Sequence, residues 1–141
     1  MYNINVLSNV DSSLILLTYK GKVLLMHRNV LPNMLKINDW CFIGGVKEKN
    51  KSFEETISRD VERETSIRLE RVELLSEPLN NDRRKHFYHA KLTDKNVNEI
   101  KREDGQTLDF FTLRELDRLR LSESTRLFIV KHRNLLEQVQ I

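Results

Sequence analysis

Residues 44–67 read GGVKEKNKSFEETISRDVERETSI, and they combine paired glycines, a polar loop and an amphipathic pattern. A polar loop follows the two glycines and ends at Ser52, which with the Glu three residues later predicts a capping box at the start of a helix. Phe53, Ile57 and Val61 recur every fourth residue and form one apolar stripe. We therefore predict a helix over residues 52–65, preceded by a glycine-containing loop and packed through this stripe.

Asp60 and Glu64 place two carboxylates on one edge of the predicted helix, because residues four apart lie one turn above the other. Like charges at this spacing repel each other. The pair therefore requires a compensating cation, which is either Arg63 on the neighbouring turn or a divalent metal ion. An acidic face exposed to solvent is the alternative interpretation of such a pair.

Short apolar runs on both sides of this helix predict strands. Residues 13–19 and 23–27 flank a Lys-Gly-Lys turn and predict a hairpin, while residues 40–43 predict a strand that ends at the paired glycines. The later part of the chain predicts further strands and then two helices: strands 69–75, 85–92 and 108–111, and helices 112–119 and 124–139. This mixture predicts an α+β fold, an α/β/α sandwich with a mixed sheet packed between helices.

The composition indicates one folded domain, predicted over residues 1–141. Charged residues make up 32% and apolar residues 39% of the chain, whereas disordered chains are poorer in apolar residues. We find neither an apolar run of the roughly 20 residues that a membrane span needs nor a basic leader, so we expect a cytoplasmic protein. The single cysteine, Cys41, lies between aromatic residues and is expected to be a buried thiol.

The net charge of +3 favours a phosphate-bearing small molecule as the partner without requiring a nucleic acid. The densest basic run, residues 83–86, follows two asparagines and an aspartate and is interpreted as a solvated hairpin turn. No membrane partner is expected. The assembly state is open, with a homodimer among the alternatives.

The spacing of residues 45–67 resembles the Nudix box of the MutT-like hydrolases, with matches at Gly45, Arg59, Val61, Glu64 and Ile67. Asp60 replaces the first Glu of the family's helix by a shorter acid. Residues 23–28, 40–45 and 105–116 also resemble family segments, so the resemblance covers about residues 14–136. It implies the Nudix fold and a pyrophosphohydrolase that cleaves the diphosphate linkage of a nucleoside diphosphate derivative with Mg²⁺ or Mn²⁺.

The resemblance also implies roles for particular residues. It implies metal ligation by Asp60, Glu64 and Asp104, with Glu103 as a substitute for Asp104 and Glu48 as a further carboxylate. The general base stays open among Glu64, Glu103 and Asp104, because this assignment needs geometry. The candidates for substrate binding are two glycines, whose backbone a ligand can approach, and two arginines: Gly44, Gly45, Arg28 and Arg63. Arg59 is a candidate for the catalytic site, where it would contact phosphate or orient the carboxylates. Arg28 and Arg59 are equally suited to structural salt bridges.

Three residues depart from the family pattern: Lys51 replaces the loop Glu, Arg63 a helix Glu, and Ser66 the Gly that ends the helix. Arg63 puts a fixed positive charge where a metal ligand is expected. Two functions therefore remain as hypotheses. One is a hydrolase with a sparse metal site, and the other is a nucleotide-binding or sensor module in which Arg63 and Lys51 pair with phosphates. The sequence leaves the nucleotide open among nucleoside triphosphates, nucleotide sugars, dinucleotides and capped RNA.

Overall fold

The computed structural model describes residues 11–28, 39–76, 85–101 and 106–138. The chain forms two compact units, one of residues 1–16 and 43–101 and the other of residues 17–42 and 102–141. Strand β1 (Ser12–Tyr19) contributes its first residues to the first unit and its last residues to the second.

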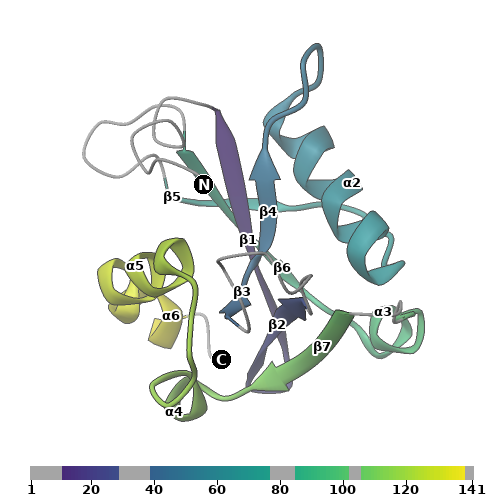
Figure 1. The fold of residues 1–141 in the computed structure, drawn as a ribbon. Coiled ribbons are helices and arrows are strands. Elements are labelled where there is room, and N and C mark those ends of the chain that lie inside the picture. The colour runs from purple at the N-terminus through teal and green to yellow at the C-terminus, as the bar shows by residue number, and fades with distance from the viewer. Residues whose placement is uncertain (1–10, 29–38, 77–84, 102–105, 139–141) are drawn as a thin grey trace. The chain divides into compact units, whose positions relative to one another are not determined.

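The first unit contains β4 (Ile43–Val46), β5 (Glu73–Ser76), β6 (Lys85–Lys91) and the helices α2 (Phe53–Thr65) and α3 (Asp94–Asn98). Strand β4 runs antiparallel to the start of β1, with Ile43 opposite Ile15. Strands β5 and β6 are also antiparallel, with Leu74 opposite Tyr88. Helix α2 packs against β4 (Figure 1), which puts the box helix beside the strand that carries the paired glycines.

Helix α2 confirms the prediction for residues 52–65. The Ser52 hydroxyl accepts a hydrogen bond of 3.0 Å from the backbone N–H of Glu55, and the Glu55 carboxylate accepts one of 3.2 Å from the backbone N–H of Ser52. Ile57 and Val61 are fully buried, as the apolar stripe predicts. The helix ends at Ser66, whose φ of 69° is the left-handed conformation that favours glycine at this position.

The prediction that a strand ends at the paired glycines is wrong, because both lie inside β4. A separate short strand, β3 (Trp40–Cys41), precedes it. Gly44 has a φ of 148°, and a Cβ added there would lie 2.1 Å from the carbonyl oxygen of Ser13. A Cβ added at Gly45 would meet nothing within 4 Å. The glycine at position 44 is therefore required by the close approach of β4 to β1.

The second unit is built on β2 (Lys22–Arg28), which forms the predicted hairpin with the end of β1. Lys20 and Gly21, the two turn residues, both have positive φ, at 47° and 79°, as tight two-residue hairpin turns require. Strand β7 (Gln106–Phe111) pairs antiparallel with β2, from Val23 opposite Phe111 to Arg28 opposite Gln106. Strand β3 pairs with Met26 and His27 of β2.

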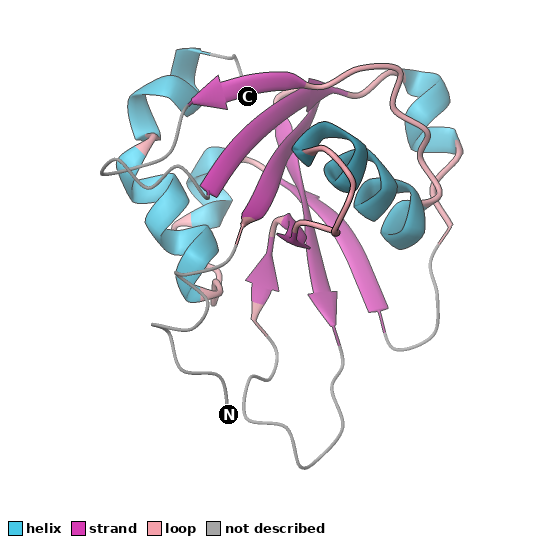
Figure 2. Ribbon diagram, turned by 90° about the horizontal axis from the view of Figure 1, so that it is seen from above, coloured by secondary structure: helices cyan, strands magenta, loops and turns pink. Residues whose placement is uncertain are grey.

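The helices of the second unit are α4 (Leu113–Leu116), α5 (Glu123–Lys131) and α6 (Arg133–Gln138), which Figure 2 distinguishes from the strands by colour. The predicted helix over 112–119 begins with its capping box at Thr112 but ends after one turn. The predicted helix over 124–139 is two helices, because the chain leaves helical geometry at His132, where φ is −114° and ψ is 21°.

Two further differences concern the first unit. The strand predicted over 69–75 begins only at Glu73, and helix α3 was not predicted although Thr93 and Asn96 form a capping box at its start. The α+β class is confirmed, since both units combine strands with helices. Cys41 is only partly buried, contrary to the prediction of a buried thiol. Within the described ranges, no helix combines the length and apolar character needed to cross a bilayer.

Candidate functional site

Glu48 joins the loop before α2 to two arginines of the helix. Its Oε2 accepts a hydrogen bond of 3.0 Å from Nη1 of Arg59, and its Oε1 lies 3.9 Å from Nη2 of Arg63. Arg63 also donates a hydrogen bond to Oδ1 of Asp60, the contact that the i,i+3 spacing predicts. We call these four residues, Glu48, Arg59, Asp60 and Arg63, the box network.

The path of the loop explains why Glu48 reaches the helix. The backbone N–H of Glu48 donates to the hydroxyl of Thr56 at 3.3 Å, and that hydroxyl donates to the carbonyl of Ser52 at 2.9 Å. Thr56 is fully buried, so the loop is attached to a fixed point on α2. Asn50 takes a positive φ of 63°, and the N–H of Lys51 lies 3.3 Å from the carbonyl oxygen of Glu48, which turns the chain back on itself.

Asp60 is the most enclosed member of the box network, with 13% of its side chain exposed. Burial raises the pKa of Asp60 above its ordinary value, and the negative charges of Glu48 and Glu64 raise it further, while Arg63 opposes the shift through its hydrogen bond and its charge. The three carboxylates therefore share one electrostatic environment. This environment favours a positive charge beside Asp60.

The arginines lie outside the acids that they neutralise. Arg59 and Arg63 have 56% and 57% of their side chains exposed, against 32% for Glu48 and 13% for Asp60. A guanidinium of this exposure can change partners without disturbing the core, because its aliphatic stem and head are largely in water. In the box network, Arg59 and Arg63 are therefore exposed side chains that can move, whereas the carboxylates of Glu48 and Asp60 are more buried.

The residues of the α2 edge fit a divalent cation in donor chemistry, because Mg²⁺ prefers carboxylate oxygens. In the part of the chain that the structure describes, however, no three Asp, Glu, His or Cys side chains converge as a metal site. Arg63 instead holds the carboxylate of Asp60. A metal ion that binds Asp60 must therefore either displace the Arg63 guanidinium from Oδ1 or lie close to its positive charge.

A family model describing the NUDIX domain matches residues 9–131. The chain belongs to the Nudix family. This membership confirms the family that the sequence resemblance predicted. A search of curated proteins finds no match to this Nudix chain.

Solved structures share the fold at low sequence identity. A MutT structure from work on Aliivibrio salmonicida and Vibrio cholerae is 17% identical, with a TM-score of 0.66 over 92% of this chain and 98% of the other. The NUDIX domain of Shewanella oneidensis NrtR, complexed with ADP ribose, is 18% identical, with a TM-score of 0.61 over 96% and 99%. A UDP-X diphosphatase is 22% identical, with a TM-score of 0.65 over 92% and 62%. At these identities the comparison supports the Nudix fold.

The structure brings some of the predicted site residues together. Arg59 and Arg63 both pair with Glu48, Arg63 also pairs with Asp60, and Glu64 lies partly buried one turn beyond Asp60 on α2. Gly44 and Gly45 lie in the neighbouring strand β4. Arg28 ends β2 in the other unit, and Glu103 and Asp104 fall outside the described residues. The general base and the third predicted metal ligand therefore stay predictions.

The sequence predicted Glu48 only as a further candidate carboxylate. It did not predict that Glu48 pairs with Arg59 and Arg63. The partners are eleven and fifteen residues away, and no helical or strand spacing relates them. The available signal was the local excess of lysines around one acid in the loop KEKNK, residues 47–51. That signal does not identify which distant cation the acid contacts.

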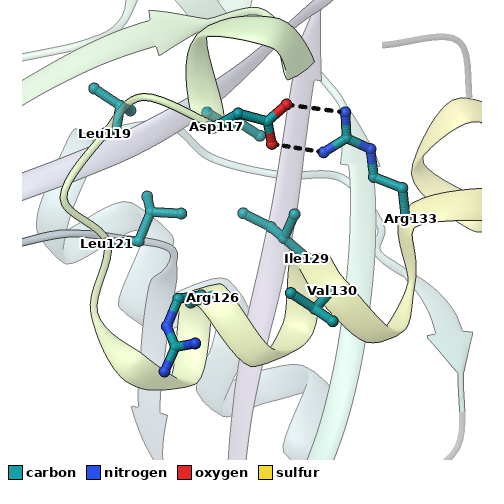
Figure 3. A pocket seen from close by; sticks show the side chains of 8 residues that line it. Asp117, Leu119, Leu121, Arg126, Ile129, Val130 and Arg133 are labelled. Carbon is teal, nitrogen blue, oxygen red and sulfur yellow. Dashed lines mark hydrogen bonds and ion pairs between the residues drawn. The ribbon is translucent and has the colours of Figure 1, made fainter.

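Two surface pockets are lined by residues that do not belong to the box network. One of about 310 Å³ lies in the second unit between α4 and the α5–α6 pair (Figure 3), where Arg133 forms a two-point ion pair of 2.8 and 3.3 Å with Asp117. Another of about 400 Å³ lies in the first unit along residues 71–73 and 89–91. Neither pocket is lined by a residue of the Nudix box.

Proposed function

We propose that the chain binds a nucleoside diphosphate derivative along the edge of α2 and cleaves its diphosphate linkage with a divalent metal ion, Mg²⁺ or Mn²⁺. One observation carries this proposal: Glu48, Asp60 and Glu64 share one electrostatic environment with two exposed arginines. Carboxylates suit the metal, and guanidinium groups suit phosphate oxygens. Two similar structures support a nucleotide as the substrate class, because one is complexed with ADP ribose and the other is named a UDP-X diphosphatase.

In this proposal Asp60 and Glu64 hold the metal, with Asp104 as the third ligand or Glu103 in its place. A bound divalent ion would screen the negative charge of the phosphate oxygens. Arg59 and Arg63 would pair with those oxygens, and Arg28 is a further candidate for this role. Gly44 and Gly45 would line the approach to the diphosphate through their backbone. Glu64, Glu103 and Asp104 are the candidates for accepting the proton of the attacking water.

The contact between Arg63 and Asp60 favours a second function, a nucleotide-binding or sensor module without turnover. In this alternative Arg63 takes the place of a metal ion and pairs directly with phosphate oxygens. The NrtR domain complexed with ADP ribose is a Nudix-fold protein that binds such a ligand. Both functions use the same edge of α2, so they differ in whether a bond is broken.

A substrate panel separates the two functions. Nucleoside triphosphates, nucleotide sugars, dinucleotides and capped RNA are incubated with the protein and Mg²⁺ or Mn²⁺, and phosphate-containing products are resolved by chromatography. Turnover of one member that is lost on metal chelation supports the hydrolase. Binding of one member without products across the panel supports the sensor. If no member binds or reacts, both proposals fail.

We also propose that residues 1–141 act as a single domain, although residues 1–16 with 43–101 and residues 17–42 with 102–141 form separate compact units. Strand β1 supports this proposal, because it contributes residues to both units. Denaturant unfolding followed by two probes tests it. One coincident transition is expected, and two separate transitions would contradict it.

A further inference from the structure

We propose that Arg63 makes metal binding by this chain conditional on a bound diphosphate. Arg63 serves as an internal cation for Asp60 when the site is free, and phosphate oxygens draw it away and so release the carboxylate to a metal ion. The inference concerns the regulation of the α2 edge and rests on the nucleotide site proposed above. It does not require that the nucleotide is cleaved.

The contacts of Arg63 carry the first step. Its guanidinium donates to Asp60 and lies 3.9 Å from Glu48, so one side chain neutralises two of the acids on this edge. A divalent ion that binds Asp60 without a nucleotide must either displace Arg63 from Oδ1 or bind the other carboxylate oxygen beside the guanidinium. Metal binding to the free protein is therefore opposed by displacement and by repulsion between cations.

The exposure of Arg63 carries the second step. With 57% of its side chain exposed, Arg63 can turn toward solvent while Asp60 stays in place beneath it. A diphosphate carries several acceptor oxygens and more negative charge than one carboxylate, and it can be held by a guanidinium at two points. Phosphate binding thus gives Arg63 a new partner and leaves Asp60 without its cation.

Arg59 has a different role from Arg63 in the proposed regulation of metal binding. Its Nη1 lies 3.0 Å from Oε2 of Glu48. Within the described residues, Arg59 forms its ion pair with Glu48 rather than with Asp60. When Arg63 leaves, Arg59 still neutralises Glu48 and keeps the loop on the helix. Asp60 is then the carboxylate that is released, with Glu64 on the next turn as a second ligand.

Thermodynamic linkage gives the expected behaviour. If a diphosphate raises the affinity for the metal, the metal raises the affinity for the diphosphate by the same factor. Removing Arg63 should abolish the part of this coupling that comes from displacement. The free protein would then bind metal well, and the diphosphate would lose one of its cations.

The test uses Mn²⁺ as the metal probe, with bound ion measured by electron paramagnetic resonance, and α,β-methylene-ADP as the diphosphate probe. Arg63→Gln is compared with Arg68→Gln, a matched control that also removes one positive charge. Arg68 pairs with Glu62 at 3.3 Å and has 81% of its side chain exposed. Circular dichroism verifies that both variants are folded, and a titration without protein corrects for chelation by the nucleotide.

We expect Arg63→Gln to bind Mn²⁺ alone about tenfold more tightly than the wild type, a factor within the usual range of coupling between sites. Arg68→Gln should retain wild-type affinity. With the metal removed by EDTA, calorimetry should show weaker binding of α,β-methylene-ADP to Arg63→Gln and unchanged binding to Arg68→Gln. In the wild type, the analogue should increase the affinity for Mn²⁺ by a larger factor than in Arg63→Gln.

Equal Mn²⁺ affinities for Arg63→Gln and Arg68→Gln would overturn the inference, as would a wild-type affinity for Mn²⁺ that the analogue does not change. The proposed hydrolase is judged separately by the substrate panel. Coupling without turnover would reject the hydrolase and retain the inference. Turnover with equal metal affinities in the two variants would do the reverse.

Discussion

Arg59 donates a hydrogen bond of 3.0 Å to the carboxylate of Glu48, which lies eleven residues earlier in the chain. The same carboxylate lies 3.9 Å from Arg63, so Glu48 restrains both cations of the box network. An acid that occupies two arginines competes with any phosphate for them. The affinity of the free protein for an anion is therefore set partly by Glu48.

We predict that Glu48→Gln binds α,β-methylene-ADP more tightly than the wild type when metal is absent, because both guanidinium groups lose an acidic competitor. The unfolding free energy should fall by at most about 1 kcal/mol, since these ion pairs are largely exposed. Calorimetry in EDTA and urea denaturation measure the two effects. Glu54→Gln removes the same charge from the exposed first turn of α2 and is the control. Weaker nucleotide binding to Glu48→Gln than to this control would disprove the competition.

The paired glycines should respond differently to one methyl group. Gly44→Ala is expected to destabilise the fold by at least about 2 kcal/mol, because its Cβ would lie 2.1 Å from the Ser13 carbonyl oxygen and the φ of 148° is strained for alanine. Gly45→Ala should keep wild-type stability, since its Cβ meets nothing within 4 Å. Urea denaturation of both variants tests this difference. Similar losses in the two variants would show that the close approach to β1 is not the reason for Gly44.

Ser66→Gly should stabilise the protein. Ser66 holds a φ of 69° at the end of α2, and a left-handed conformation costs a residue with a Cβ roughly 1–2 kcal/mol. Glycine avoids this cost but loses more entropy on folding, so we expect a net gain of about 0.5 kcal/mol. The midpoint of urea unfolding should rise for Ser66→Gly and not for Ser66→Ala. A lower midpoint for the glycine variant would contradict the conformational explanation.

Glu64→Gln should lower turnover roughly 100-fold on the substrate that the panel identifies, because it removes a charge from a proposed ligand or base while keeping the shape of the side chain. Thermal unfolding should change little. Glu62→Gln, on an exposed face of the same helix, should retain turnover. Wild-type rates in Glu64→Gln would exclude Glu64 from both proposed roles.

Stability should decrease as the pH falls below about 6.5, the ordinary pKa of histidine. Burial lowers the pKa of His132 in the folded protein, and the charge of Lys131 lowers it further. The unfolded chain therefore binds a proton in a pH range where the folded chain does not. His89, whose pKa is lowered mainly by burial, acts in the same direction. Urea denaturation at pH 7.5 and 5.5 should show a smaller loss for His132→Gln than for the wild type, and an equal or larger loss would be the contrary result.

The sequence predicts elements whose signals are local. The extent of α2 follows from Ser52, Glu55 and the apolar stripe, all within a few turns of one another. The strand assignment at Gly44 failed because the need for glycine there comes from Ser13, a residue of another strand. The break at His132 also escaped the pattern, since the apolar positions continue in the next helix and include the fully buried Leu136.

The contacts of the candidate site also differ in whether their signals are local in the sequence. The contact between Asp60 and Arg63 lies within one helical turn and was predictable from their spacing. The contact between Glu48 and Arg59 depends on the turn at Asn50 and on the buried hydroxyl of Thr56, neither of which has a periodic signature. The sequence thus identified the acidic edge of α2 and named Glu48 as a candidate carboxylate, but it did not predict that Glu48 pairs with the two arginines.

The capping box fixes the start of α2 without using the side chains of the proposed site. Ser52 and Glu55 define the start of α2 through each other, and the side chain at position 51 is not one of their hydrogen-bond partners. Hydrogen bonds with Ser52 lower the pKa of Glu55, and the positive charge of Lys51 contributes in the same direction. The exchange of an acid for Lys51 therefore leaves the helix start intact. The helix that carries Asp60 and Glu64 is therefore retained whether or not the chain cleaves its ligand, so its presence does not distinguish the two proposed functions.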